Sequence, residues 1–308
     1  MNTKVSIIGA GHVGATVTLM LAQRELADLV MVDIADGLAC GKALDLMEAA
    51  PVLGYNCNIL GTNFYEDIKD SQIVVVTAGL ARKPGMDRLD LLKKNAAIIK
   101  DITENIKKYA PQSFILMVTN PVDVMTYYAL RLSGFNRQRV FGQAGVLDGA
   151  RFSSFIAKEL NVSAQDVKSL VLGGHGDTML PLPRYTTVCG VPITELIKEE
   201  RLNQLIDRTR NAGSEIVSLL KTGSAYYSPA ASTAYMVEAV LKDKKSILAA
   251  SVCLNGEYGL YDVCVGVPVK LGKEGVEEII ELELKPEEKE SLHKSATVYK
   301  ESIKELSI

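Results

Sequence analysis

The stretch "KVSIIGAGHVGATVTLMLAQ", residues 4–23, decides the fold of this 308-residue chain. A short β-rich run leads into a glycine turn, and apolar residues at helical spacing follow. The turn has the pattern GxGxxG, which is weak evidence alone but specific after a strand and at a helix start. The glycines let the backbone approach a pyrophosphate, and the free N–H groups of the helix start face that anion. We therefore predict a dinucleotide site with contacts from Gly9, Ala10, Gly11, His12, Val13 and Gly14.

A carboxylate follows the second predicted strand, "LADLVMVDI". Asp33 can accept hydrogen bonds from a ribose diol and would repel a 2′-phosphate, so it favours NAD over NADP. The alternative is a packing turn with a surface aspartate. The strand, the glycines, the helix and the acid all occur in the order that a dinucleotide site needs, which argues against this alternative. The side chain of His12 is expected to point to solvent.

Strands and helices alternate along the first half of the chain. Strands are predicted in "SQIVVVTA" and "SFILMVTNPVD", and helices in "DGLACGKALDLMEAA" and "RLDLLKKNAAIIKDITENIKKYA". Continuous apolar strands between helices indicate a parallel sheet covered on both faces. After about residue 145 come a helix, the strand "VKSLVLGG", a hairpin, long helices, antiparallel strands and a helix from Pro286. We predict an α/β protein, with a Rossmann-type doubly wound domain in residues 1–145 and an α+β substrate domain in residues 146–308.

Composition excludes several classes of function. The formal charge of −3 argues against nucleic-acid binding, and the apolar runs are too short for a membrane span. The N-terminus enters a strand without the apolar core of a secretion signal. The five cysteines form no CxxC pair, so we expect reduced thiols in a cytoplasmic protein. No cluster of His, Cys and carboxylates has the spacing of metal ligands, so we predict no metal.

Two further stretches carry candidate catalytic groups. His175 lies between glycines in "LGGHGDTM", directly after a predicted strand. Asp148 and Arg151 in "AGVLDGARF" are three residues apart at a predicted helix start, so they share one face. Taken alone, Asp148 could be an N-cap and Arg151 a surface charge.

A loop with two arginines follows the apolar run "IVVVTA". In "GLARKPGMDR", Arg82 and Arg88 lie six residues apart after Gly79. Two guanidiniums on such a loop indicate a small anion that is gripped and released.

Five motifs occur in order: "GAGHVG", "VVVTAGLARKPGMDR", "VTNPVD", "QAGVLDGARF" and "GGHGDTM". Together they resemble the NAD-dependent malate dehydrogenases of the lactate-dehydrogenase-like type, and the resemblance covers essentially the whole chain. It implies reversible hydride transfer between (S)-malate and NAD+, giving oxaloacetate and NADH, as in the tricarboxylic acid cycle. It also implies a homo-oligomer, with a tetramer favoured over a dimer.

The resemblance assigns roles to four of these side chains. His175 matches the residue that takes the hydroxyl proton as hydride leaves, and Asp148 matches the acid that orients the imidazole. Arg151 matches the clamp on the substrate C1 carboxylate, for which a planar fork suits a bidentate grip. Arg88 matches the loop arginine that polarises the reacting carbonyl.

Further positions concern substrate choice and cofactor contact. Arg82 matches the position that binds a second carboxylate, and in lactate-specific relatives this position looks like glutamine. Asn120 matches a residue that bonds substrate near the nicotinamide, and Asn95 and Val118 match cofactor contacts.

Two rival functions remain open at this point. The same chemistry could act on another 2-hydroxy acid such as lactate, against which Arg82 argues because an unpaired desolvated guanidinium is costly. A non-catalytic NAD-binding module would keep the glycine turn but would have no reason to combine His175, Asp148, Arg88 and Arg151.

Overall fold

The computed structural model describes residues 3–80 and 88–306. The first half alternates strands and helices, as the sequence predicts, because apolar strands and amphipathic helices follow one another. It comprises β1 (Lys4–Ile8), α1 (His12–Ala22), β2 (Asp28–Val32), α2 (Leu38–Leu53), β3 (Ile59–Thr62), η1 (Tyr65–Ile68), β4 (Ile73–Val76), α3 (Arg88–Tyr109), β5 (Phe114–Met117), α4 (Val122–Ser133), η2 (Arg137–Arg139) and β6 (Val140–Gln143). The strands β3 and β6 were not predicted.

The second half has shorter strands and longer helices. It comprises α5 (Gly145–Leu160), β7 (Val167–Lys168), β8 (Val171–Leu172), β9 (Leu180–Pro181), η3 (Pro183–Tyr185), β10 (Thr187–Val188), β11 (Val191–Pro192), α6 (Ile193–Leu196), α7 (Glu199–Leu220), α8 (Tyr227–Leu241), β12 (Ser246–Asn255), η4 (Glu257–Gly259), β13 (Tyr261–Gly272), β14 (Gly275–Ile279) and α9 (Pro286–Lys304). The prediction of one strand in "VKSLVLGG" was wrong, since β7 pairs with β10 and β8 pairs with β9 in separate sheets.

One large sheet connects both halves. Its order is β14-β13-β12-β6-β5-β4-β1-β2-β3, and the strands from β3 to β6 are parallel. The strand order reverses between β1 and β4, where parallel α/β sheets bind ligands at their carboxyl ends. The antiparallel strand β12 continues the sheet by pairing with β6. The glycine turn after β1 and the loop after β4 therefore lie side by side.

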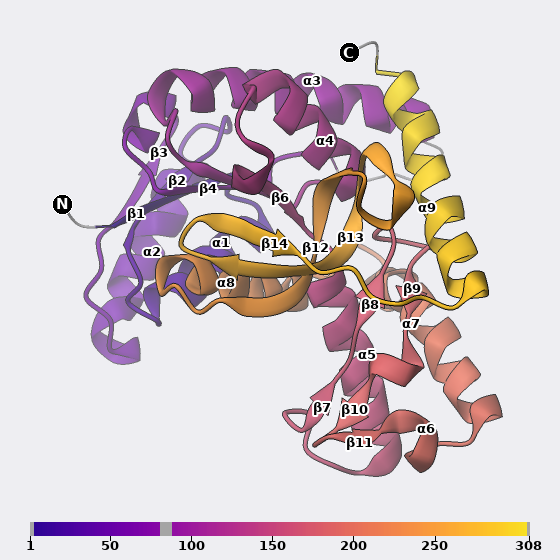
Figure 1. Ribbon diagram of the computed structural model, residues 1–308. Coiled ribbons are helices and arrows are strands. Elements are labelled where there is room, and N and C mark those ends of the chain that lie inside the picture. The colour runs from indigo at the N-terminus through magenta and orange to yellow at the C-terminus, as the bar shows by residue number, and fades with distance from the viewer. Residues whose placement is uncertain (1–2, 81–87, 307–308) are drawn as a thin grey trace.

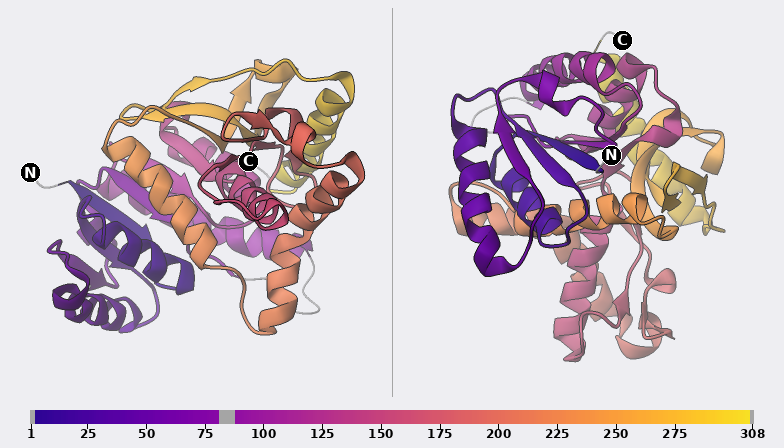
Figure 2. Two further views of the ribbon diagram at one scale, coloured as in Figure 1. Left: turned by 90° about the horizontal axis from the view of Figure 1, so that it is seen from below. Right: turned by 90° about the vertical axis from the view of Figure 1, so that its left-hand side faces the viewer.

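Helices cover both faces of this sheet (Figure 1). The helices α3 and α4 pack on one side, and α1 and α8 pack together on the other. A smaller lobe containing α5, α6 and α7 projects from the sheet (Figures 1 and 2). It has its own apolar cluster, which includes Phe152, Ile156 and Leu202, whereas the main core runs through both halves. The sheet edge and α5 thus form a fixed frame for the residues between them.

Two general features bear on the environment of the chain. Among the residues described, no helix combines the length and hydropathy that a membrane span needs. All five cysteines are free thiols.

Candidate active site

The glycine turn after β1 is tightly packed on one side and open on the other. Gly9 has a φ of +105°, and a Cβ there would lie 2.7 Å from the backbone nitrogen of Ala78. A Cβ on Gly14 would lie 1.9 Å from the carbonyl oxygen of Gly9. A Cβ on Gly11 would meet nothing within 4 Å. The outer glycines therefore permit the fold, and the middle one leaves an open approach to the backbone.

This open approach fits the phosphates and ribose of a dinucleotide. Gly11 is the N-cap of α1 and supplies no capping side chain, so the positive end of the helix faces outward. Asp33, directly after β2, accepts hydrogen bonds from the N–H of Ala10 at 2.6 Å and of Ala35 at 2.9 Å. These bonds fix the carboxylate beside the turn, where its remaining lone pairs can accept from ribose hydroxyls.

Two other residues of the turn differ in exposure. His12 is exposed, and its ring stacks on Tyr226 at a centroid distance of 5.1 Å. Val13 is half-buried against the core. The aromatic pair joins the start of α1 to the start of α8, beside the open face of the turn.

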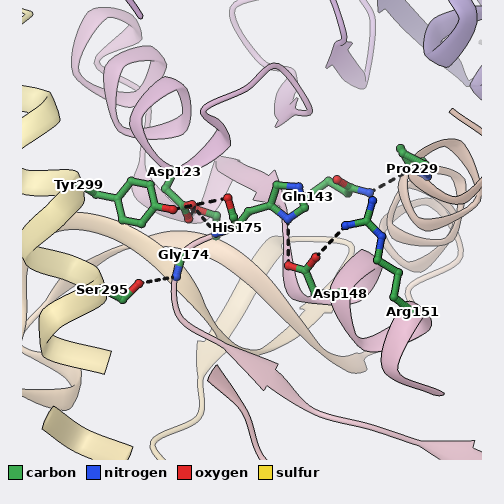
Figure 3. A network of polar contacts seen from close by, with 10 residues as sticks. Asp123, Gln143, Asp148, Arg151, Gly174, His175, Pro229, Ser295 and Tyr299 are labelled. Carbon is green, nitrogen blue, oxygen red and sulfur yellow. Dashed lines mark hydrogen bonds and ion pairs between the residues drawn. The ribbon is translucent and has the colours of Figure 1, made fainter. Parts of the chain in front are cut away.

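A histidine, a carboxylate and a guanidinium meet between the sheet and α5 (Figure 3). The Nδ1 of His175 lies 2.9 Å from Oδ2 of Asp148, and Nη1 of Arg151 lies 3.4 Å from Oδ1 of the same carboxylate. The Asp148 side chain is only 2% exposed. Because Nδ1 contacts the carboxylate, Nε2 of the imidazole is left for proton exchange with a substrate.

The position of Asp148 excludes a plain capping role. The helix α5 begins at Gly145 with Ala144 as its N-cap, so Asp148 lies in the first turn. Its two carboxylate oxygens bond His175 and Arg151. The spacing of three residues does place Asp148 and Arg151 on one face of the helix.

Arg151 has an unused hydrogen-bond donor. Within the described part of the chain, its Nε is a buried nitrogen without a partner. Burial lowers the pKa of the guanidinium, although the charge of Asp148 opposes this effect. A buried donor without a partner is costly, and a carboxylate is the group that an arginine fork binds best. The site therefore fits an anionic ligand beside His175.

Asp123 holds the backbone of the loop that carries His175, and the sequence pattern did not single it out. Its Oδ2 accepts the backbone N–H of His175 at 2.8 Å, and its Oδ1 accepts the hydroxyl of Ser251 at 2.6 Å. The side chain starts in the first turn of α4 and is fully buried. One carboxylate thus joins α4, β12 and the loop of His175. An acid in the first turn of a mostly apolar helix was the available signal.

The last helix also contacts this loop, as Figure 3 shows. The hydroxyl of Ser295 accepts the backbone N–H of Gly174 at 2.8 Å, and the hydroxyl of Tyr299 donates to the carbonyl of His175 at 3.5 Å. A Cβ on Gly174 would lie 1.8 Å from the ring of Tyr299. No feature of the sequence indicates the contact of Tyr299 with His175.

The two buried acids, Asp148 and Asp123, raise the pKa of His175. Burial alone would lower the pKa of His175, but the charge and hydrogen bond of Asp148, with a contribution from Asp123, raise it above the ordinary value. Burial raises the pKa of Asp123 to about 6, and the hydrogen bonds from Ser251 and His175 oppose that rise. The imidazolium form of His175 is therefore stabilised by the residues that position it.

The base of the loop after β4 is held by Asn95. This buried amide accepts the N–H of Leu80 at 2.8 Å and donates to the carbonyl of Asn120 at 2.8 Å. Asn120 is exposed and precedes Pro121 through a cis peptide bond, and Val118 is half-buried directly after β5. All three lie at the carboxyl edge of the sheet; direct contact of Asn95 and Val118 with a cofactor stays a prediction.

The two loop arginines are not placed. Arg82 lies outside the described residues, and so does the side chain of Arg88, although α3 begins at Arg88. In the rest of the chain, no three His, Cys, Asp or Glu side chains form a group that could hold a metal ion.

Comparison with known proteins identifies both halves of the chain. The NAD binding domain of lactate/malate dehydrogenase matches residues 3–142, and the alpha/beta C-terminal domain matches residues 145–307. A malate dehydrogenase of Thermomicrobium roseum is 56% identical over 303 residues, and one of Chlorobium limicola is 54% identical over 304 residues. Each alignment covers 98% of both proteins.

Solved structures give the same result. The apo malate dehydrogenase of Picrophilus torridus has a TM-score of 0.97 and 46% identity, and the match covers 100% of this chain and 98% of that one. A lactate dehydrogenase of Cryptosporidium parvum, complexed with lactic acid and nicotinamide adenine dinucleotide, has a TM-score of 0.96 and 40% identity over the same shares. The Rossmann-type fold and the predicted family are confirmed: the chain belongs to the lactate/malate dehydrogenase family.

Proposed function

We propose that this chain catalyses the reversible oxidation of (S)-malate to oxaloacetate with NAD+. The observation that carries the proposal is the arrangement of His175, Asp148 and Arg151, in which a charge-supported imidazole lies beside an unpaired buried guanidinium nitrogen. Malate dehydrogenases at more than half identity over nearly the full length support the choice of substrate.

Each side chain has one task in the proposed reaction. Bound NAD supplies the acceptor for the hydride, and the glycine turn and Asp33 hold it. Arg151 binds the C1 carboxylate and so orients the substrate. The Nε2 of His175 takes the hydroxyl proton during oxidation and returns it during reduction. Asp148 keeps the imidazole oriented and stabilises its cationic form. Arg88 polarises the carbonyl.

The choice of malate over lactate is assigned to Arg82. A second carboxylate needs a cationic partner, and this residue would supply it. With pyruvate the guanidinium would be desolvated without a partner, which disfavours binding. Asn120 would bond the substrate from the sheet edge.

Replacement of the histidine tests the reaction class. In His175→Asn, we expect NADH binding to stay near normal because the glycine turn is untouched, while turnover with oxaloacetate is lost. Binding is measured by NADH fluorescence and turnover by NADH absorbance. Near-normal turnover in the variant, with any 2-keto acid, would rule out His175 as the proton donor.

We also propose a homo-oligomer, with a tetramer favoured over a dimer. Several apolar side chains of α2 are exposed in the single chain, among them Leu44 at 61% and Val52 at 87%, and a second copy could cover them. Light scattering of the purified protein measures the state directly. A monomer at micromolar concentration would contradict the proposal.

Three further assignments concern location, metabolic role and domain boundary. We infer a cytoplasmic location, which five free cysteines support. A place in the tricarboxylic acid cycle follows from malate as substrate. The boundary between a cofactor domain in residues 1–145 and a substrate domain in residues 146–308 is supported by family matches that end at 142 and begin at 145.

A further inference from the structure

Two cysteines face each other across neighbouring antiparallel strands, far along the sheet from the glycine turn. Cys253 on β12 is the register partner of Cys264 on β13. Directly opposite residues of an antiparallel pair point to the same face of the sheet. Cys264 is fully buried and Cys253 is half-buried. The other three cysteines have no such partner in the ladders of the described strands.

The hydrogen bonds of Gly266 show which type of pair the cysteines form in the β12–β13 ladder. Gly266 donates its N–H to Gly173 and accepts from the N–H of Gly173, both at 2.9 Å, on the side away from β12. The rung Ser251–Gly266 is therefore a non-hydrogen-bonded pair of the β12–β13 ladder.

Pair types alternate along such a ladder. The register is regular from Ser251–Gly266 to Cys253–Cys264, two residues further along each strand. The cysteine rung is thus also a non-hydrogen-bonded pair, in which Cα atoms are about 4.5 Å apart and side chains are closest. This separation lies inside the range of about 4.4 to 6.8 Å that disulfides adopt.

The two thiols differ in access and in acidity. Cys253 lines a surface cavity of about 270 Å³, together with Arg137 and Gln138. The hydrogen bond with Cys264 lowers the pKa of the Cys253 thiol, although burial opposes this effect, and Arg131 and Arg137 add to the lowering. Burial raises the pKa of Cys264. The accessible thiol of Cys253 therefore has the buried thiol of Cys264 directly opposite it.

We propose that Cys253 and Cys264 form a redox-active dithiol whose oxidant is a low-molecular-weight disulfide. The Cys253 thiolate attacks one sulfur of the reagent, the reagent's S–S bond breaks, and one small thiol leaves with a proton. Cys264 then loses its proton and attacks the Cys253 sulfur, which expels the second small thiol. Two protein thiols are oxidised to one disulfide while one reagent disulfide is reduced to two thiols.

The dithiol is connected to the loop of His175 through the next rung on the same face of the sheet, Ser251–Gly266. Ser251 lies two residues before Cys253 on the same face and donates to Asp123, which accepts the N–H of His175. The opposite residue of that rung, Gly266, bonds Gly173, which lies directly after β8 and leads to the loop of His175. Oxidation is therefore expected to lower kcat with oxaloacetate and to leave NADH affinity unchanged. This consequence rests on the proposed function, whereas the thiol chemistry does not.

Peptide mapping of the natural chain tests the chemistry. The protein is treated with 2-hydroxyethyl disulfide, its remaining thiols are alkylated, and it is cleaved at glutamates, since Glu257 separates the two cysteines. We expect a linked peptide pair containing Cys253 and Cys264, which dithiothreitol releases. In Cys264→Ser the reaction should stop at a stable mixed disulfide on Cys253. The matched control Cys189→Ser, which removes an exposed thiol, should still form the linked pair.

Four results have distinct meanings. If the exposed Cys189 reacts and no linked pair forms, the dithiol assignment is overturned. A mixed disulfide on Cys253 that persists equally in the natural chain and in Cys264→Ser also overturns it. If the linked pair forms and kcat is unchanged, the coupling to His175 is overturned. A chain that never reduces oxaloacetate yet forms the linked pair refutes the proposed function and leaves the dithiol standing.

Discussion

Replacing Asp148 by asparagine removes one charge from the site and nearly preserves its shape. The Asp148 side chain is only 2% exposed, and its carboxylate lies 2.9 Å from Nδ1 of His175 and 3.4 Å from Nη1 of Arg151. Asparagine can keep one acceptor oxygen but cannot stabilise the imidazolium or the guanidinium. The variant Asp148→Asn therefore tests whether the charge supports catalysis.

The expected loss follows from the strength of a buried bond to a charged group. Such hydrogen bonds contribute about 1.5 to 3 kcal/mol. At about 1.4 kcal/mol per tenfold change, kcat/KM for oxaloacetate should fall by roughly 10-fold to 140-fold. Because the carboxylate is buried, solvent screening does not reduce this figure.

The pH dependence gives a second, independent readout. Asp148 raises the pKa of His175, and reduction of oxaloacetate needs the protonated imidazole. Reduction is thus retained below this pKa and is lost as pH rises through it. In Asp148→Asn the pKa falls, so the decline should move to lower pH.

Steady-state NADH oxidation across pH, with NADH affinity measured by fluorescence, provides the assay. The exposed Asp166, changed to asparagine, is the matched control and should leave all values unchanged. A change of less than twofold in kcat/KM, with an unshifted pH profile, would refute the role given to the Asp148 charge.

Four further variants probe the frame of the site. In Asp123→Asn, the buried carboxyl whose pKa rises from 3.8 to about 6 on folding is replaced by a neutral group. The free energy of unfolding of the natural chain should therefore exceed that of the variant by most below pH 3.8, and the difference should shrink by about 3 kcal/mol as pH rises through 6. Urea unfolding across pH measures this difference, and a difference that does not change with pH would contradict the prediction. Gly14→Ala places a Cβ 1.9 Å from the carbonyl oxygen of Gly9 and should lower the melting temperature. The Cβ of Gly11→Ala meets nothing within 4 Å, so this variant should keep the melting temperature and weaken NADH binding. Equal melting temperatures of the two variants would count against the roles assigned to these glycines. Ser295→Ala removes the acceptor of the Gly174 N–H and should lower kcat with little change in NADH affinity. An unchanged kcat would show that this hydrogen bond does not position His175.

Local signals made the first βαβ unit predictable. The strand, the glycine turn and the helix of residues 4–23 are coded by neighbouring residues, and Asp33 follows directly after β2. The strands β3 and β6 were missed because each has four residues and contains a glycine, Gly61 or Gly142. The pairing of β12 with β6 joins residues more than one hundred positions apart, and no local pattern encodes it.

The site residues also divide into those that a local pattern predicts and those that depend on distant parts of the chain. Helical spacing put Asp148 and Arg151 on one face, but only the family resemblance linked them to His175, which lies 27 residues from Asp148. Asp123 could not be distinguished from an acid that favours a helix N-terminus, because burial depends on the strands that cover it. The contacts of Ser295 and Tyr299 depend on where the last helix docks, which the sequence pattern does not encode.

The choice between oxaloacetate and pyruvate bears most directly on the proposed function. We would measure kcat/KM for both keto acids with NADH, on the natural chain and on Arg82→Gln. Loss of a buried charged partner should reduce the oxaloacetate reaction by roughly 30-fold to 3000-fold, from about 2 to 5 kcal/mol. A strong preference for oxaloacetate that Arg82→Gln abolishes is the predicted result. A preference that survives the substitution would show that another residue binds the second carboxylate, and turnover of neither keto acid would contradict the proposed reaction.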